Sequence, residues 1–135
     1  MSMSSSPEVI LVDTNVLSYR YGKRPDFEIY RPYLIGKIPA ISFVSYGEAL
    51  RGARCANWSE ARVSDLENHL KSYLLIPGDI QLVRAYAKTQ AACKFAGVGI
   101  GDNDCWIAAT ALLHHIPLLT NDNNMHRVPK LIAIP

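Results

Sequence analysis

Short runs of branched aliphatic residues recur along this chain, and each is separated from the next by segments of helical character. The first run is Val9-Ile-Leu-Val12, the second begins at Ile38, and later runs cover 74–76, 117–120 and 131–134. Apolar runs of this length are typical of parallel strands that are covered on both faces. Their alternation with helices predicts an α/β fold, a three-layer α/β/α domain with a mostly parallel sheet of four to five strands.

The helices are expected between these strands, where apolar residues recur at helical spacing. Ser45 is a candidate N-cap, and its spacing to Glu48 matches a capping box. Asp102 or Asn103 can cap the last long helix. The expected helical ranges are 14–21, 26–35, 45 onward, 59–73, 79–95 and 102 to about 115.

The length of 135 residues suits one domain, which we expect over residues 7–135. Met1 to Ser6 form a polar, serine-rich tail that is expected to be disordered and that lacks the apolar core of a secretory signal. The three cysteines form no CxxC pair, and their odd number fits the reducing cytoplasm. No apolar run approaches the ~20 residues that cross a membrane, so no membrane association is expected.

Four acidic residues stand at or near the junctions of strands and helices: Asp13, Glu48, Asp104 and Asp122. In a parallel sheet the carboxyl ends of the strands lie along one edge, where such folds bind ligands. Carboxylates that meet there repel one another unless a cation lies between them. Mg²⁺, or Mn²⁺ in its place, is the simplest candidate because hard cations prefer oxygen ligands. The pattern indicates a metal-dependent enzyme that acts on a phosphate ester.

Each acid also has a local structural explanation, and these alternatives stay open at this point. Asp13 can cap the following helix, and Asp122 lies in a turn rich in Asn and Asp. Glu48 can pair with Arg51 one helical turn later. Asp104 lies in the first turn of a helix, where the helix dipole favours a negative charge.

Neighbouring polar residues could support the four acids. Asn15 could orient Asp13 by a hydrogen bond, and Thr120 could offer its hydroxyl to a metal-bound water. Asn124 could supply a neutral oxygen ligand. Asp102 is two positions before Asp104 and therefore lies on a different side of the helix, which assigns it to capping or to a peripheral role.

The net charge of +2 is too small to indicate nucleic-acid binding. The 12 acidic residues include the four candidates, however, so eight remain against 14 Lys and Arg. A basic body around an acidic site suits an anionic polymer whose cleavage needs a metal ion, although scattered solubilising charge explains it equally well. The candidate phosphate contacts are Arg20, Lys23, Arg24, Arg51 and Arg54.

Taken together, these residues resemble the PIN-domain ribonucleases, and most of all the VapC-type toxins of type II toxin–antitoxin systems. The resemblance extends from Val9 to Leu131. Its strongest segments are Leu11-Val-Asp-Thr-Asn15, the Ser42-x-x-Ser-x-x-Glu48-x-x-x-Gly52 pattern, the Asn103-Asp-x-Trp-Ile-Ala-Ala-Thr-Ala111 run and Pro117-Leu-Leu-Thr-Asn-Asp122.

The resemblance implies that Asp13, Glu48, Asp104 and Asp122 form the catalytic set, with Asp13, Asp104 and Asp122 as ligands of Mg²⁺. Asn124 departs from the family pattern, because relatives often carry another acid there. We therefore expect one firmly held ion, with a second that arrives with RNA.

The resemblance also implies a metal-dependent endoribonuclease that hydrolyses RNA phosphodiester bonds, a VapB-type antitoxin as protein partner, and a homodimer. Two alternatives share the fold: a PIN nuclease in RNA processing, and a non-catalytic module whose acidic pocket only binds. A phospho-receiver domain, by contrast, requires an acidic pair after the first strand and an acceptor Asp after the third. The sequence Ile76-Pro-Gly78 supplies no such acceptor.

Overall fold

A computed structural model describes residues 7–135, so the tail that was expected to be disordered, residues 1–6, lies outside the described residues. Within residues 7–135 the sheet has five strands, all parallel, in the order β3-β2-β1-β4-β5. The strands are β1 (Val9–Val12), β2 (Ile38–Ser42), β3 (Leu74–Ile76), β4 (Leu118–Leu119) and β5 (Ala133–Ile134).

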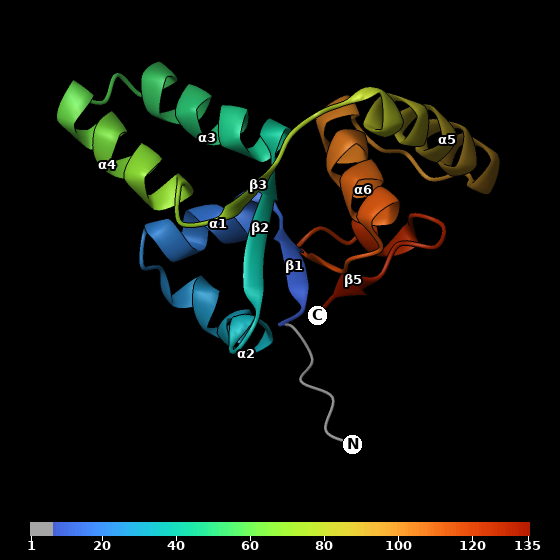
Figure 1. Ribbon diagram of the computed structural model, residues 1–135, viewed down its shortest axis with the longest axis horizontal. Helices are drawn as coiled ribbons and strands as arrows, with labels where there is room; N and C mark the ends of the chain where they lie inside the picture. Colours follow the sequence, from blue (N-terminus) through green and yellow to red (C-terminus); the bar gives the residue numbers. More distant parts are fainter. Residues whose placement is uncertain (1–6) are drawn as a thin grey trace.

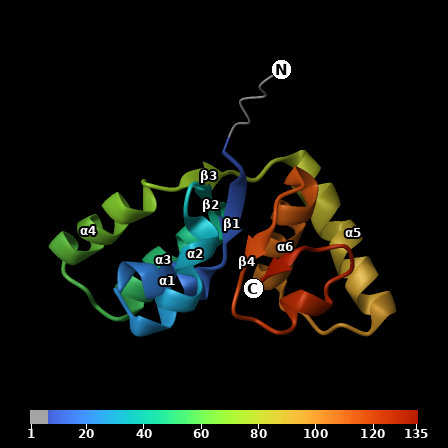
Figure 2. The same cartoon turned by 90° about the horizontal axis from the view of Figure 1, so that it is seen from below.

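Helices cover both faces of this sheet, so the predicted three-layer α/β/α architecture is confirmed (Figures 1 and 2). Figure 2 shows α1 to α4 on one side of the strands and α5 and α6 on the other. The helical elements are α1 (Thr14–Tyr21), the 3₁₀ helix η1 (Pro25–Ile29), α2 (Arg31–Leu34), α3 (Phe43–Cys55), α4 (Glu60–Leu70), α5 (Ile80–Ala96), α6 (Asp102–His114) and the 3₁₀ helix η2 (Met125–Arg127).

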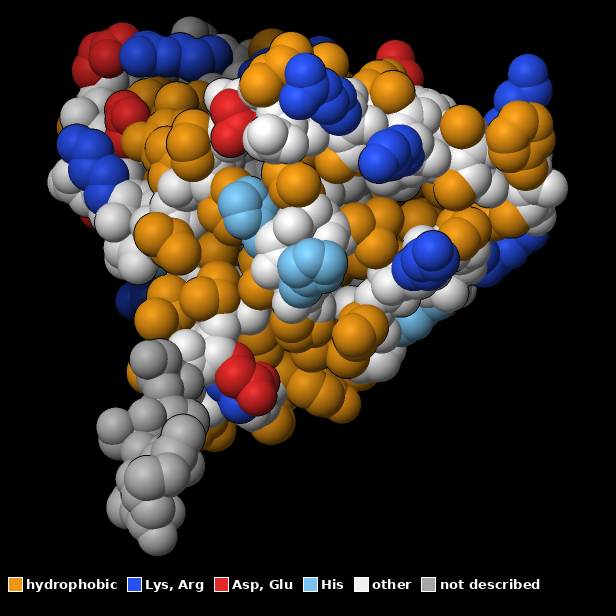
Figure 3. Space-filling view, turned by 45° about the vertical axis from the view of Figure 1, so that its right-hand side comes forward, with side chains coloured by type: hydrophobic (Ala, Val, Ile, Leu, Met, Phe, Trp, Pro, Cys, Tyr) orange, Lys and Arg blue, Asp and Glu red, His pale blue; other side chains and the backbone are white. Residues whose placement is uncertain are grey.

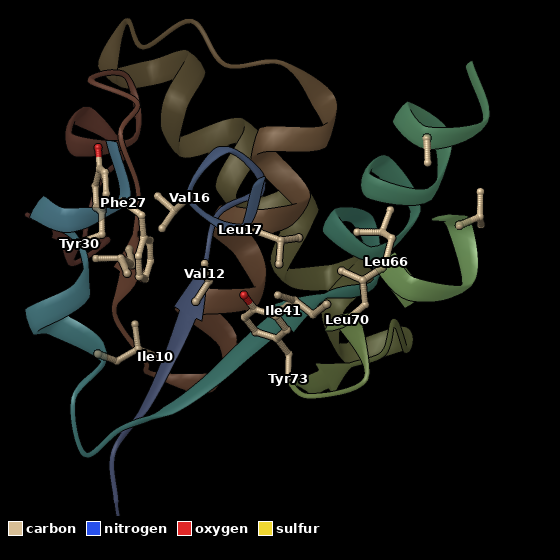
Figure 4. Packing of buried hydrophobic residues seen from close by; sticks show 13 residues of the cluster. Ile10, Val12, Val16, Leu17, Phe27, Tyr30, Ile41, Leu66, Leu70 and Tyr73 are labelled. Atoms are coloured by element: carbon tan, nitrogen blue, oxygen red, sulfur yellow. The ribbon is translucent and has the colours of Figure 1, made fainter. Parts of the chain in front are cut away.

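The strands divide the apolar core into two clusters, because successive side chains of a strand point to opposite faces. Ile10 and Val12 of β1 join the cluster beneath α1 to α4, which Figure 4 shows together with Leu66 and Leu70 of α4. Leu11, between them, joins the cluster beneath α5 and α6. All three side chains are buried, as expected for a strand inside a covered parallel sheet.

Small residues allow α6 to approach the sheet closely. Ala108 and Ala111 are fully or almost fully buried in the same cluster as Leu11, Ala40 and Leu118 of the strands. The short side chains on both sides leave room for the helix backbone to lie near the strands.

The order of the strands places a ligand site above β1 and β4. The chain proceeds from β1 to β2 and β3 in one direction, then returns to β4 on the other side of β1. Open α/β sheets bind ligands at such a reversal, outside the carboxyl ends of the strands. Asp13 follows β1, and Asp122 lies shortly after β4.

Three expectations about the extent or the capping of helices were wrong. The helix expected over 26–35 is divided into η1 and α2. The helix expected from Ser45 begins at Phe43, because the Ser42 side chain accepts a hydrogen bond from the Ser45 backbone N–H and is the N-cap. Gly101, not Asp102 or Asn103, is the N-cap of α6.

Candidate functional site

Asp13 is both the N-cap of α1 and the most buried of the four acids. Its Oδ1 accepts a hydrogen bond from the Thr14 backbone N–H at 2.8 Å, and Oδ2 accepts one from the Thr120 hydroxyl at 2.6 Å. Burial is the main cause that raises the pKa of Asp13. The two hydrogen bonds oppose the rise, and the charges of Asp122 and Glu48 add to it. The capping explanation and the site explanation therefore both apply to this residue.

Glu48 is turned from its own helix toward α1 and α6. Its Oε1 accepts a hydrogen bond from the Thr14 hydroxyl at 2.7 Å, and its Oε2 accepts one from the Asn103 side chain at 3.2 Å. The buried Ser45 hydroxyl lies 2.9 Å from that of Thr14. Because the Thr14 proton is donated to Glu48, Ser45 is the donor in this second contact. The capping box expected between Ser45 and Glu48 is therefore replaced by contacts to other helices.

Asp104 lies in the first turn of α6, and the charges of the other three acids raise the pKa of its carboxyl group. Burial and then the charges of Asp13, Asp122 and Glu48 raise its pKa from 3.8 to about 6. Its side chain makes no hydrogen bond to another residue in the described range 7–135. Asp104 is thus the member of the set that is least fixed by neighbours and most affected by the negative charge around it.

Asp122 is connected to Asp13 through Thr120. The Asp122 backbone N–H donates to the Thr120 hydroxyl oxygen at 3.0 Å, and that hydroxyl donates in turn to Asp13. The Asp122 side chain accepts a hydrogen bond from the Asn124 backbone N–H at 2.9 Å, which is the turn contact expected from the sequence. Local turn chemistry and proximity to the other acids coexist here as well.

The four carboxylates suit a hard divalent cation in chemistry and charge, although they do not enclose one. Among residues 7–135, no three Asp, Glu, His or Cys side chains stand close enough together to surround a metal ion. The charges of Asp122 and Glu48 nevertheless raise the pKa values of both Asp13 and Asp104, so the four carboxylates lie close enough to interact electrostatically. Mg²⁺ keeps several water ligands and usually binds through one or two carboxylates, so three direct protein ligands are not required. The site fits an ion that is held partly through water.

Two neighbouring polar residues differ from expectation. Asn15 was expected to orient Asp13, but its exposed side chain donates to the Asn121 side chain at 3.2 Å instead. Asp102 accepts hydrogen bonds from the Tyr86 hydroxyl at 3.0 Å and from the Gln90 amide at 3.2 Å. Asp102 therefore belongs to the contact between α5 and α6, and it does not cap the helix.

Two of the predicted phosphate contacts are engaged in exposed ion pairs. Arg24 pairs with Asp26 at 3.2 Å, and Arg54 pairs with Glu60. Arg51 is exposed and was expected to pair with Glu48, but the four ion pairs of residues 7–135 do not include this one.

Arg20, Lys23 and Arg24 line one cavity of about 760 Å³ at the end of α1, and none of the four acids lines it. The Arg20 guanidinium lies 5.3 Å from the centre of the Tyr73 ring, and its Nη1 is buried without a hydrogen-bond partner among the described residues. The structure therefore gathers three of the five predicted basic residues around one cavity. Arg20, the nearest of them along α1, lies about 10 Å from Asp13 at about 1.5 Å of helix per residue.

The half of the chain that carries α5 and α6 is basic outside the acid cluster. Residues 80–135 contain five Lys and Arg residues, and their acids are Asp102, Asp104 and Asp122 alone. Figure 3 shows this side of the molecule, where Lys and Arg side chains stand among apolar ones. The predicted contrast between an acidic site and a basic body is present here.

The sequence analysis did not assign Thr14 or Asn103 to the site. Both flank a predicted acid, and both donate to Glu48 from elements other than α3. The signals in the sequence were their position next to Asp13 and Asp104 and their place within the segments that carry the family resemblance. The contact to Glu48 itself depends on how α1, α3 and α6 pack.

None of the helices described in residues 7–135 combines the length and the apolar character that crossing a membrane requires.

The PIN domain family matches residues 10–131 of this chain. Ribonuclease VapC4 of Mycobacterium tuberculosis (strain ATCC 25618 / H37Rv) is 30% identical over 126 residues, which cover 92% of this chain and 94% of the relative. Ribonuclease VapC1 of Haemophilus influenzae (strain R2866) is 28% identical over 116 residues, which cover 84% of this chain and 87% of the relative.

Solved structures agree with these relatives. The structure of VapBC2 from Rickettsia felis bound to a DNA fragment from their promoter has a TM-score of 0.81 and 26% identity, and covers 93% of this chain and 97% of that one. The structure of VapBC-1 from nontypeable Haemophilus influenzae has a TM-score of 0.79 and 26% identity, and it covers 93% of this chain and 96% of that one. The chain therefore belongs to the PIN-domain family, in which the VapC ribonucleases are its relatives.

Proposed function

We propose that this protein is a divalent-metal-dependent endoribonuclease and the toxin of a toxin–antitoxin pair. One observation carries the proposal. Burial and the charges of three other acids, Asp13, Asp122 and Glu48, raise the pKa of Asp104, while none of the ion pairs within residues 7–135 involves any of these four acids. Acids that served only the fold would be expected to be paired with Lys or Arg when partly buried. Unpaired carboxylates at a ligand-binding edge instead support a site for an external cation.

Asp13, Asp104 and Asp122 would hold the ion, which we take to be Mg²⁺ with Mn²⁺ as a substitute. When bound, such an ion lowers the pKa of a water molecule and offsets the charge of the phosphate. Asp13 is already fixed by Thr14 and Thr120, so its oxygens are positioned before a ligand arrives. Asp104 lacks hydrogen bonds to the described residues and can turn toward the ion or take up a proton.

The reaction would be hydrolysis of one RNA phosphodiester bond. The water oxygen bonds to phosphorus, the bond from phosphorus to O3′ breaks, and the products carry a 5′-phosphate and a 3′-hydroxyl. Glu48, which accepts hydrogen bonds from Thr14 and Asn103, would accept a further one from the attacking water. Thr120 supports Asp13. Asn15 and Asn124, exposed beside the site, are proposed as weaker supports.

RNA is supported as the substrate by the relatives, which are named as ribonucleases, and by the basic surroundings of the acids. Arg20, Lys23 and Arg24 line a cavity that could contact the RNA backbone beyond the cleaved bond. Arg51 and Arg54 are proposed as further phosphate contacts on α3. Folded RNA with unpaired loops is the expected target, because exposed bases and backbone can enter such a site.

The test compares two N-cap aspartates. Asp13 caps α1 and Asp79 caps α5, and each accepts a backbone hydrogen bond at its helix start. Asn remains a good N-cap, so both Asp13→Asn and Asp79→Asn should fold. We expect Asp13→Asn to lose Mg²⁺-dependent cleavage of RNA and Asp79→Asn to retain it. Equal activity of the two variants would remove Asp13 from the site.

A small VapB-type antitoxin is the proposed partner, because the similar solved structures include VapBC pairs. An antitoxin Arg that entered the acid cluster would make charge-assisted contacts with the unpaired carboxylates. The pair would act in the cytoplasm, where RNA is available. Co-expression of the antitoxin should suppress the growth arrest caused by this chain, and growth arrest that persists despite complex formation would contradict the proposed pairing.

Self-association is proposed through a patch of exposed apolar side chains on β3 and the start of α5. Leu74, Leu75, Ile80 and Val83 are each between 44% and 59% exposed. Patches of this kind mark protein interfaces. Val83→Asp should yield a monomer in analytical ultracentrifugation, whereas Phe95→Asp, at the far end of α5 and 85% exposed, should leave the oligomeric state unchanged.

A further inference from the structure

Three aromatic rings from separate elements come together near the acid cluster. Phe43 begins α3, Tyr86 lies on α5 and Trp106 lies on α6. The rings of Tyr86 and Trp106 are stacked, with 4.0 Å between their centres and 17° between their planes. The edge of the Phe43 ring meets Trp106 at 5.9 Å and 71°. We call these three residues the aromatic shelf.

The shelf lies along the same edge of the sheet as the acids. Phe43 directly follows Ser42, the last residue of β2, and β2 is the neighbour of β1, which ends before Asp13. Adjacent strands are about 4.8 Å apart, so the shelf begins within one to two strand widths of Asp13. Trp106 is two positions after Asp104 on α6 and lies on a different side of that helix.

Neighbouring residues hold the shelf in place, yet part of the Phe43 ring is exposed to solvent. The Tyr86 hydroxyl donates a hydrogen bond to Asp102, which holds the Tyr86 ring of the stack in place. The Phe43 ring lies against Gly78 so closely that a Cβ at this glycine would come within 3.3 Å of the ring. Although Trp106 and Gly78 lie against it, the Phe43 side chain remains 40% exposed, so part of the ring is open to a ligand.

We propose that the aromatic shelf stacks an unpaired base of the RNA next to the cleaved phosphate, an inference that rests on the proposed ribonuclease function. Proteins hold single-stranded RNA by stacking its bases on aromatic side chains, and this works for every base because each has a π-face. A base inside a duplex is stacked on its neighbours and is not available to the shelf. The shelf therefore selects unpaired over paired RNA and is tolerant of sequence.

The first experiment removes the Phe43 ring by mutation and, separately, removes the RNA base beside the cleavage site. Phe43→Leu keeps an apolar side chain of similar size, Phe43→Tyr keeps the ring, and Phe95→Leu is a control on a distant exposed Phe. The substrate is a single-stranded RNA with a mapped cleavage site, with or without the base beside that site. Phe43→Leu should lower kcat/KM about 5- to 150-fold on intact RNA, the range measured for one stacked base. Phe43→Tyr and Phe95→Leu should have little effect.

The base-free substrate gives the decisive comparison. If the ring and the base contact each other, Phe43→Leu should cause little further loss on the base-free RNA, because the two changes remove the same contact. Equal losses on both substrates, or no loss on either, would overturn the proposal. A Phe43→Leu protein that becomes monomeric with unchanged kcat/KM would assign Phe43 to self-association, which also overturns it.

A binding measurement separates this proposal from the nuclease assignment. The chain has two tryptophans, so Trp58→Phe leaves Trp106 as the only one. In an Asp13→Asn background, single-stranded RNA should change the Trp106 fluorescence more strongly than the same RNA in a duplex. Such a change, together with a parent protein that shows no cleavage of RNA, would keep the shelf and remove the nuclease function. Cleavage by the parent protein without any change at Trp106 would do the opposite.

Discussion

Replacement of Asp104 by Asn should stabilise the metal-free protein at neutral and alkaline pH. Burial and three neighbouring carboxylates raise the pKa of Asp104 from 3.8 to about 6. Because the pKa is higher in the folded protein, folding favours the protonated carboxyl. Its contribution to stability is therefore fully present below pH 3.8 and is lost as the pH rises through about 6. Asn carries no charge and avoids this loss.

The magnitude follows from the two pKa values. The rise from 3.8 to about 6 corresponds to about 3 kcal/mol, at about 1.36 kcal/mol for each pKa unit. Asp104 is only partly buried, so screening by solvent reduces this value, and we expect about 1 to 2 kcal/mol. The gain of Asp104→Asn over the parent protein should be about 1 kcal/mol larger at about pH 8 than at about pH 5, because the parent carboxyl is still largely protonated at the lower pH.

Urea unfolding with a chelator present, at both pH values, measures this difference. Asp102→Asn is the matched control, because it removes a charge from the same helical turn outside the acid cluster and reports the loss of helix-dipole stabilisation. Added Mg²⁺ should stabilise the parent protein more than Asp104→Asn, since a ligand stabilises only the state that binds it. If Asp104→Asn destabilised the protein equally at both pH values, the pKa of Asp104 would not be raised, and the other three carboxylates would not repel its charge.

Three further outcomes are expected. Ser42→Ala should cost about 1 kcal/mol in urea unfolding through loss of the α3 N-cap, and Ser59→Ala, at the N-cap of α4, gives the comparison value at an exposed site. Thr120→Val should cost about 1 to 3 kcal/mol, because buried Asp13 loses a hydrogen bond, and calorimetry should show weaker Mg²⁺ binding. Gly97→Ala should lower the thermal midpoint by a few degrees, because Gly97 ends α5 with φ at +72° and a side chain there costs about 1 kcal/mol.

The sequence predicted the elements well because both faces of the sheet are covered. A strand buried on two sides must be apolar throughout, so Val9–Val12 and the later runs were distinct from their surroundings. The order of the strands, with β1 between β2 and β4, could not be read in the same way. It depends on which strand edges pair after the helices pack, and no short segment of sequence contains that information.

The candidate site shows a similar limit at the level of single side chains. Thr14 and Asn15 are neighbours in the sequence, but successive residues of an α-helix point about 100° apart. Thr14 therefore reaches Glu48 on α3, whereas Asn15 contacts Asn121 beyond β4. Sequence analysis named Asn15 as the support and missed Thr14, because the choice between them depends on the rotation of α1 relative to α3.

The acids of this site have structural duties as well, which changes how their functions should be tested. Asp13 caps α1 while its other oxygen accepts a hydrogen bond from Thr120. An Asp13→Ala variant would remove the cap together with the charge, at a cost of about 1 kcal/mol, and would leave the buried Thr120 hydroxyl without its acceptor. Loss of activity in that variant would therefore not distinguish a damaged helix from a missing carboxylate. Asp13→Asn removes the charge and keeps an acceptor oxygen for the Thr14 N–H, so the cap is retained. Its amide NH₂ group faces the Thr120 hydroxyl as a donor, and the hydroxyl oxygen can accept from it. Local capping and the proposed role in the site are thus not competing explanations for Asp13, because one carboxylate can serve both at the point where β1 passes into α1.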